Sequence, residues 1–320
     1  MITREHSGWL RALGALLLCL LCGPSTAATT AGAIDILVVA DAGDRSGRVI
    51  ETLQDHLGEA CPDPCPGPAA LTVVDSADAA RFVETFPPDM VVAIGSTAAR
   101  QVASLGLDIP TLYSFIPGTV WRELTDCCVA DSTDNGSVLL DQPPGRLLRL
   151  IREVAPGTRT VGLLAGPATA ERLTEFEQAA AMASVELLVE RVETGEDVGR
   201  TLRRLVNRVD VLLALPDPAV YNRHTVYPIL LTTYSARVPV IGFSAAMVKA
   251  GAVAGLFMTP RDVGQAIATA IHGFRSRGAF IDGETAQAFS VEINEDVLRS
   301  LRLPAVRASE LPQMLKEPRQ

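Results

Sequence analysis

The sequence predicts an α/β fold made of two Rossmann-like lobes, each built on a parallel sheet. Apolar runs of strand length alternate with segments of helical apolar spacing along most of the chain, which is the pattern of repeated βαβ units. The alternation is interrupted once, between Tyr113 and Pro144, and then resumes. At 320 residues the chain exceeds the length that one hydrophobic core usually supports, so two lobes are expected.

The first series of elements begins with Ile34 to Ala40, a continuous apolar run typical of a parallel strand buried on both faces. A helix is expected next, since Val49, Ile50, Leu53 and Leu57 recur at helical spacing. Further strands are predicted at 71–74, 90–94 and 111–115, with helices at 77–86 and 97–105. An irregular segment and a short strand at 137–140 follow, and we place the lobe boundary near Leu140.

The second series begins at Thr160, after an amphipathic helix over 145–154 that Pro143 and Pro144 introduce. Strands are predicted at 161–164, 185–189, 211–215 and 238–243, and helices near 170–183, 197–208 and 225–236. A strand at 256–258 precedes a helix over 260–275, whose Thr259-Pro260-Arg261-Asp262 start resembles a capping box. The tail after Pro304 is polar and is expected to be frayed.

The segment from Val209 to Gly273 carries a recognisable order of motifs. One strand ends in Pro216-Asp217, the next ends in Gly242-Phe243-Ser244, and the third leads into Thr259-Pro260. In this order and spacing the chain resembles the substrate-binding proteins of ABC transporters with a type I periplasmic-binding fold. The resemblance is strongest to a subgroup that includes tryptophan- and tyrosine-binding lipoproteins. It extends more weakly over most of the remaining chain, including Asp141-Gln142-Pro143.

This resemblance implies a multi-crossing hinge, in which the chain passes three times between the lobes. The second crossing would be at 256–258, and 289–293 would cross back. The N-terminal lobe would comprise 34–140 plus 258–278, and the C-terminal lobe 141–257 plus 285–310. Hinges are then expected near Leu140, Phe257 and Glu284.

The resemblance further implies that the lobes capture a small molecule, amino-acid-like or an organic anion, and deliver it to an ABC permease. The subgroup's ligands do not transfer directly, because the 113–136 segment is longer than the usual connector. The alternative is a periplasmic sensory or interaction protein that presents its ligand to a receptor kinase or an outer-membrane transporter.

The N-terminus, residues 1–27, reads as an export signal. Arg4 and Arg11 precede an apolar core over 13–22, and small residues end at Ala27. This core is shorter than the roughly 20 residues that span a bilayer. Cys19 and Cys22 each follow a Leu rather than the small residue of a lipobox. We therefore expect cleavage near Ala27 and a soluble periplasmic protein rather than a lipoprotein, with an uncleaved anchor as the alternative.

Charge and motifs exclude several other classes of function. A net charge of -9 without a long Lys/Arg cluster argues against nucleic acid or an anionic membrane as partner. The loops at Gly95 and Gly166 lack the spacing of phosphate-binding motifs, so no nucleotide cofactor is expected. His224 is close in sequence to Asp217, but no nucleophile signature accompanies the pair, and we predict a monomeric protein that is not an enzyme.

Four cysteines follow the signal, namely Cys61, Cys65, Cys127 and Cys128. In an oxidising compartment they can form disulfides in three connectivities. A zinc site is the alternative, but neither pair has the usual two-residue ligand spacing, so no metal is expected.

Ligand-binding residues are predicted from the strand ends, because the carboxyl ends of parallel strands and the following helix starts line the ligand crevice. The first lobe offers Asp41, Ser96, Thr97, Tyr113, Ser114 and Asn135. The second offers Gly166, Thr169, Asp217, Tyr221, Asn222 and Ser244.

The sharpest complementary roles fall to Ser96-Thr97, which suits an anion, and Asp217, which suits an ammonium or NH group. The plainer alternative is that Ser96 caps its helix and that Asp217 forms a turn between prolines. Tyr113 and Tyr221 are the preferred aromatic contacts, ahead of Phe115, Trp121 and Phe243.

Overall fold

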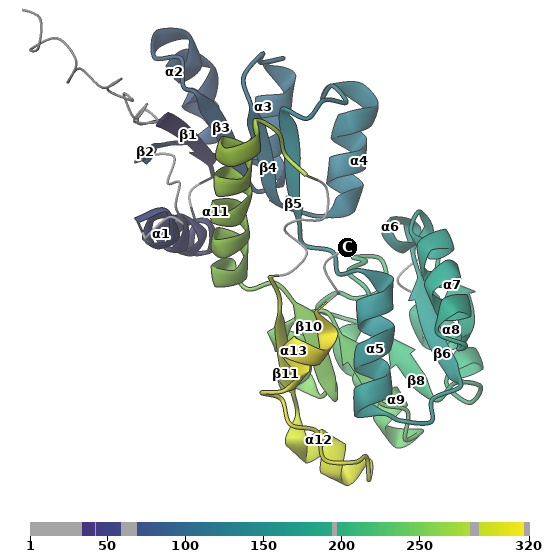
Figure 1. Cartoon of the computed structure of the whole chain (residues 1–320). Helices are drawn as coiled ribbons and strands as arrows, with labels where there is room; N and C mark the ends of the chain where they lie inside the picture. The colour runs from purple at the N-terminus through teal and green to yellow at the C-terminus, as the bar shows by residue number, and fades with distance from the viewer. Residues whose placement is uncertain (1–33, 42, 59–68, 194–196, 282–287, 317–320) are drawn as a thin grey trace, which may run out of the picture.

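The computed structural model describes residues 34–41, 43–58, 69–193, 197–281 and 288–316. Two α/β lobes lie one above the other in Figure 1, each with a sheet at its centre and helices around it. In the N-terminal lobe the strands run in the order β2-β1-β3-β4-β5. In the C-terminal lobe the order is β11-β10-β9-β8-β6-β7. The two-lobed α/β fold predicted from the sequence is confirmed.

The N-terminal sheet is parallel throughout. Its strands are β1 (Ile34–Ala40), β2 (Ala69–Val74), β3 (Met90–Ile94), β4 (Thr111–Ile116) and β5 (Asn135–Leu139). Its helices are α1 (Asp44–Gly58), α2 (Ala79–Thr85) after the short turn η1 (Ser76–Asp78), α3 (Ser96–Ser104) and α4 (Gly118–Cys127). Strand β3 is buried at every position, as expected of a central strand covered on both faces.

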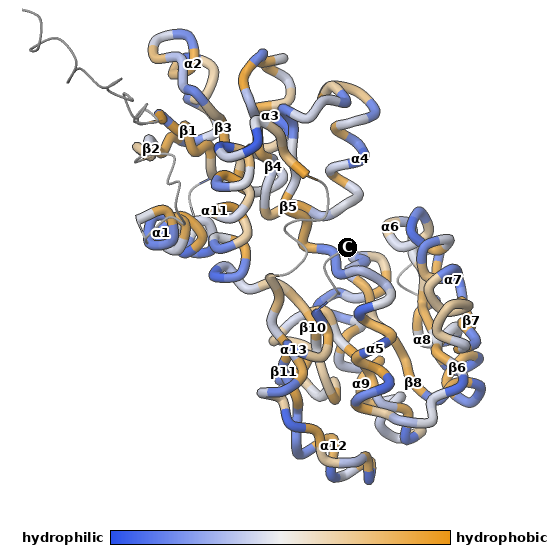
Figure 2. The backbone as a smooth tube through the Cα atoms, viewed as in Figure 1, coloured by the Kyte–Doolittle hydropathy of each residue, from blue (hydrophilic) through white to orange (hydrophobic). Residues whose placement is uncertain are grey.

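The C-terminal sheet is parallel except for the antiparallel pair of β10 and β11. Its strands are β6 (Thr160–Ala165), β7 (Glu186–Arg191), β8 (Val211–Leu213), β9 (Val240–Gly242), β10 (Ala254–Phe257) and β11 (Ser290–Ile293). The helices that follow in this half are α5 (Pro144–Val154), α6 (Pro167–Ala170), α7 (Leu173–Met182), α8 (Val198–Leu205), α9 (Val226–Ser235), α10 (Ala245–Ala250), α12 (Glu295–Ser300) and α13 (Leu311–Leu315). Figure 2 shows apolar strands inside this lobe and polar residues on its outer turns.

One helix that is late in the sequence packs on the N-terminal lobe. Helix α11 (Pro260–Arg277) follows β10 and lies against α1, β4 and β5. Its start is a capping box formed by Thr259 and Asp262. A Cβ atom at Gly264 would lie 2.7 Å from Thr52 Cβ and 2.8 Å from the Val49 carbonyl oxygen. Glycine at this position therefore allows the close approach of α11 to α1.

Two expectations about local structure are wrong. The segment after Tyr113 is not irregular throughout, because α4 forms there and buries Val120 and Leu124. The tail after Pro304 is not simply frayed, because α13 buries Leu311 and Leu315 beside α5. In both cases a short helix is stabilised by tertiary contacts that its own periodicity does not reveal.

A disulfide joins the adjacent residues Cys127 and Cys128 at the end of α4. Cys61, Cys65, the predicted signal over 1–27 and the predicted hinge at Glu284 lie outside the described residues. Within the described ranges, no helix has the length and apolar character needed to cross a membrane.

Candidate functional site

A cavity of about 1050 Å³ lies between the two lobes. The N-terminal lobe contributes Arg45, Arg48, Phe115, Pro117 and Thr119 to its lining. The connections between lobes contribute Leu140, Asp141 and Met258. The C-terminal lobe contributes Thr169, Arg172, Asp217, Tyr221, Phe243, Ser244 and Phe257, the last residue of β10. Mostly apolar walls with a few polar groups are the usual composition of a small-molecule site.

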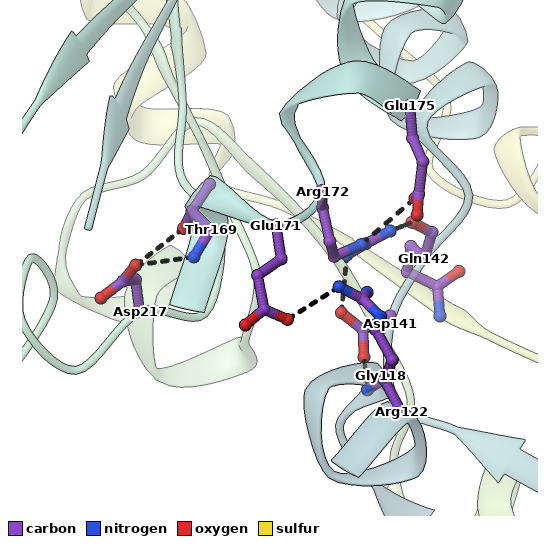
Figure 3. Close-up of polar contacts among 9 residues, drawn as sticks. All are labelled: Gly118, Arg122, Asp141, Gln142, Thr169, Glu171, Arg172, Glu175 and Asp217. Carbon is purple, nitrogen blue, oxygen red and sulfur yellow. Dashed lines mark hydrogen bonds and ion pairs between the residues drawn. The ribbon is translucent and has the colours of Figure 1, made fainter. Parts of the chain in front are cut away.

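Asp217 is buried, with 2% of its surface exposed, in the loop after β8. Its Oδ2 accepts hydrogen bonds from the backbone N and the Oγ1 of Thr169, both at 2.9 Å (Figure 3). Its Oδ1 accepts a third from the Ala219 backbone N at 3.1 Å. A Cβ atom at residue 166 would lie 2.5 Å from Oδ1, so Gly166 makes room for the carboxylate. Three donors compensate the negative charge of Asp217 in its buried position.

Tyr221 stands one helical turn after Asp217, and its backbone N donates to the Asp217 carbonyl at 2.7 Å. Its ring meets that of Phe243 edge to face, with centroids 5.7 Å apart. The hydroxyl is buried and has no hydrogen-bond partner among the described residues. Burial, and then the charge of Asp217, raise the pKa of Tyr221, so the hydroxyl keeps its proton and can donate.

The N-terminal wall of the cavity depends on an irregularity in β4. The pairing of β4 with β5 shifts register between Ser114 and Ile116. Phe115 stands at this point with φ of 58°, a left-handed conformation that is uncommon for an aromatic residue. Phe115 lines the cavity, whereas its neighbour Ser114 is fully buried and donates to the Ala93 carbonyl at 2.8 Å.

A polar network crosses from one lobe to the other beside the cavity (Figure 3). The Asp141 carboxylate accepts from Arg172 Nη1 at 2.6 Å and from the backbone N of Gly118, at the start of α4. Arg172 also donates to the Gln142 carbonyl and to Glu175, each at 3.3 Å. The side chain of Asp141 therefore joins the connection after β5 to both lobes.

A second contact between the lobes lies nearer the surface. Arg122 of α4 forms an ion pair of 2.7 Å with Glu171, which lies between α6 and α7 (Figure 3). The two side chains are 39% and 54% exposed, so solvent screens the pair.

Four of the predicted ligand-binding residues line the cavity, and all belong to the C-terminal lobe: Thr169, Asp217, Tyr221 and Ser244. Ser244 also caps α10 by accepting from the Met247 backbone N. Gly166 supports Asp217 from behind, as described above.

The other predicted residues do not line it. Asp41 accepts from Ser76 Oγ at 2.5 Å, and Asn135 donates to the Ala130 carbonyl at 3.0 Å. The Asn222 amide bonds the Pro218 carbonyl at 3.0 Å. Tyr113 is buried, its pKa raised to about 12 by that burial, with its ring 5.5 Å from Trp121. Ser96 and Thr97 begin α3 without contributing to the lining.

Several charged cavity residues were not predicted, chiefly Arg45, Arg48, Asp141 and Arg172. The two arginines are three residues apart, just after the carboxyl end of β1, and that placement could have indicated them. Asp141 stands in a motif that carries the resemblance, but nothing in the sequence connects it to Arg172. His224 is exposed, lies beside Arg223 and does not line the cavity.

Comparisons with known proteins show relatives of the same architecture. Residues 72–301 match the family described as ABC transporter substrate binding protein. Comparison with curated protein sequences finds no match.

Among solved structures, an ABC domain from Streptococcus pneumoniae in complex with L-Trp is similar, at 18% identity and a TM-score of 0.55, covering 88% of this chain and 98% of that one. A substrate binding protein with adhesive properties from Clostridium difficile, in a ligand-free, open structure, gives 15% identity and a TM-score of 0.65, covering 85% and 96%. A conserved domain protein from Vibrio cholerae gives 18% identity and a TM-score of 0.53, covering 88% and 98%. These likenesses support the two-lobed fold.

Proposed function

The chain belongs to the family of ABC transporter substrate-binding proteins, and on that premise we propose that it captures a small molecule between its lobes for delivery to an ABC permease. The cavity of about 1050 Å³ lined by both lobes is the observation that carries this proposal. A ligand that touches both walls stabilises the closer arrangement of the lobes by the difference in its contacts to the two states. A permease would then recognise that arrangement.

Of the ligand-binding residues predicted from the sequence, we retain in this proposal those that line the cavity, namely Thr169, Asp217, Tyr221 and Ser244. Asp217 acts in this proposal mainly by holding Thr169 and the turn before Tyr221 in place, because its oxygens already accept three hydrogen bonds. We further propose export to the periplasm, removal of the signal near Ala27, and function as a monomer.

Thermal shift against a broad panel of solutes tests solute capture directly. The panel contains amino acids, organic acids, amines, sugars and nucleosides, applied to the chain from Ala28 onward. A selective ligand should raise the melting temperature, since binding to the folded state alone stabilises it. If the protein is folded and no compound of the panel raises its melting temperature, solute capture is contradicted.

A bulky substitution shows whether a hit occupies this cavity. Ala245→Trp places an indole at the lining, and Ala181→Trp on α7 is the matched control away from it. Loss of the ligand shift in the first variant only is expected.

The sensory alternative uses the same cavity and differs in the partner of the ligand-bound protein. Neighbouring genes for a permease and an ATPase would support import, whereas a sensor kinase gene would support signalling.

A further inference from the structure

We propose that the cavity takes an organic carboxylate with an apolar body, and discriminates against amino acids and amines of the same shape. This inference rests on the proposed function and names its ligand class. It follows from a comparison of the charged side chains of the cavity, some of which already have ion-pair or hydrogen-bond partners among the described residues.

Among the described residues, the two arginines of α1 are the cavity charges without an ion-pair partner. Arg45 and Arg48 line the cavity, and neither has a carboxylate partner among the described residues. Within the described residues, the Arg48 guanidinium donates only to the Asp44 carbonyl, at 3.3 Å through Nε. Two guanidinium groups one turn apart on one helix can both reach a single carboxylate.

The carboxylates of the cavity are, in contrast, engaged. Asp141 accepts from Arg172 and Gly118, and Asp217 accepts from Thr169 twice and Ala219 once. An ammonium group entering the cavity would meet Asp141 already paired with Arg172, and Asp217 only 2% exposed with three neutral donors on its oxygens. The desolvation of a cation under those conditions is unfavourable.

The neutral part of the lining sets the body of the ligand. Phe115, Phe243, Phe257 and Met258 give apolar contact from both lobes and from the connection between them. The Tyr221 hydroxyl is buried and without a partner in the described part of the chain, and it can both donate and accept a hydrogen bond. In a closer arrangement of the lobes, a carbonyl, ether or carboxylate oxygen of the ligand would accept its proton, whereas an ammonium would have only the phenolic oxygen to donate to.

Matched ligand series test the charge preference. Phenyl, indole, naphthyl and octyl bodies are each offered as a carboxylic acid, an α-amino acid and an amine, for example indole-3-propanoate, L-tryptophan and tryptamine. Isothermal titration should give the tightest binding in the acid series, with affinity falling as salt rises, because the free charges are exposed arginines. Tighter binding of an amino acid or an amine overturns the assignment and leaves solute capture intact.

If no compound of the three series binds but another member of the broad panel does, the carboxylate preference is overturned and solute capture is not. If no compound of any kind binds, the proposed function is contradicted as well. Failure of the ligand class and failure of solute capture are therefore distinguishable.

Charge-neutral variants locate the anion contact. Arg45→Gln and Arg48→Gln should each weaken the best acid by about tenfold, the usual effect of losing a charge-assisted hydrogen bond. Binding of the neutral amide of that acid should change far less. Arg81→Gln removes the same charge from the exposed face of α2, outside the cavity, and should leave both affinities unchanged. Equal affinity in all three variants would contradict a role for the α1 arginines.

Discussion

At the scale of single residues, Tyr221 has the least satisfied polar group of the cavity wall. Its ring is held by Phe243 and its backbone by Asp217, yet its hydroxyl is buried without a partner among the described residues. A buried, unpaired hydroxyl is unfavourable in the free protein. Its presence is explained if a ligand that draws the lobes closer together brings an acceptor to this hydroxyl.

Tyr221→Phe should therefore separate stability from binding. Removing the hydroxyl should leave the free energy of unfolding unchanged or raise it by up to about 1 kcal/mol, and should weaken ligand binding. Urea denaturation and titration of the same preparation measure the two effects. Tyr227→Phe, at a side chain that is 68% exposed, is the control and should alter neither. A marked loss of stability in Tyr221→Phe would reveal an intramolecular partner.

His272 on α11 provides a pH-dependent contribution to stability. Burial lowers its pKa below the ordinary value of 6.5, the His56 backbone opposes the shift, and Arg275 adds to it. The unfolded chain therefore binds the proton more tightly than the folded chain, so stability falls as the pH drops below about 6.5. Melting temperatures from about pH 7.5 to about pH 5 should decline less steeply in His272→Gln. The exposed His224 provides the control, and an identical slope in His272→Gln and His224→Gln would refute this assignment.

At the scale of elements, α13 is a helix that tertiary contacts stabilise and that the sequence pattern did not predict. Leu311 and Leu315 are buried, and the Leu315 carbonyl accepts from Arg146 and Arg149 of α5, each at 3.2 Å. Arg146 is itself fully buried and lies over the ring of Phe289, 4.3 Å from its centroid. The helix therefore closes one face of the C-terminal lobe.

Leu311→Ala should cost about 2–4 kcal/mol of unfolding free energy, as for other buried leucines. Met314→Ala, at a side chain 50% exposed on the same helix, should change it by no more than about 0.5 kcal/mol. Denaturation of both variants measures the difference. Equal small effects would mean that the tail is frayed, as its composition suggests.

The central strands and the long helix α11 could be predicted because their own residues carry a clear pattern. Strands such as β1 and β3 are continuous apolar runs, and α11 carries its capping box in the sequence. Helices α4 and α13 could not be predicted in this way, since each is short and is stabilised by packing against residues distant in the sequence. The same limit applies to the site. The rule of strand ends led to Thr169, Asp217, Tyr221 and Ser244, but the register shift at Phe115 in β4 leaves no signal in a single sequence.

At the scale of the whole molecule, two ion pairs of the described residues bridge the lobes. The Asp141–Arg172 pair lies close to the connection between the lobes, with side chains only 17% and 11% exposed. The Arg122–Glu171 pair joins α4 to the segment after α6 and is largely solvated. An exposed pair contributes at most about 1 kcal/mol. That is enough to shift a two-state equilibrium about fivefold without locking it.

Reversing one charge of the outer pair should therefore open the molecule. Glu171→Arg places two guanidinium groups where an ion pair stood, and the ligand-free radius of gyration from small-angle scattering should increase. The double variant Arg122→Glu with Glu171→Arg should restore the original value, and high salt should reduce the difference between variants. Glu123→Arg is the matched control, because its 2.7 Å pair with Arg100 is equally exposed but lies within the N-terminal lobe. If Glu123→Arg expands the protein as much as Glu171→Arg does, general charge repulsion rather than the contact between lobes governs the dimensions.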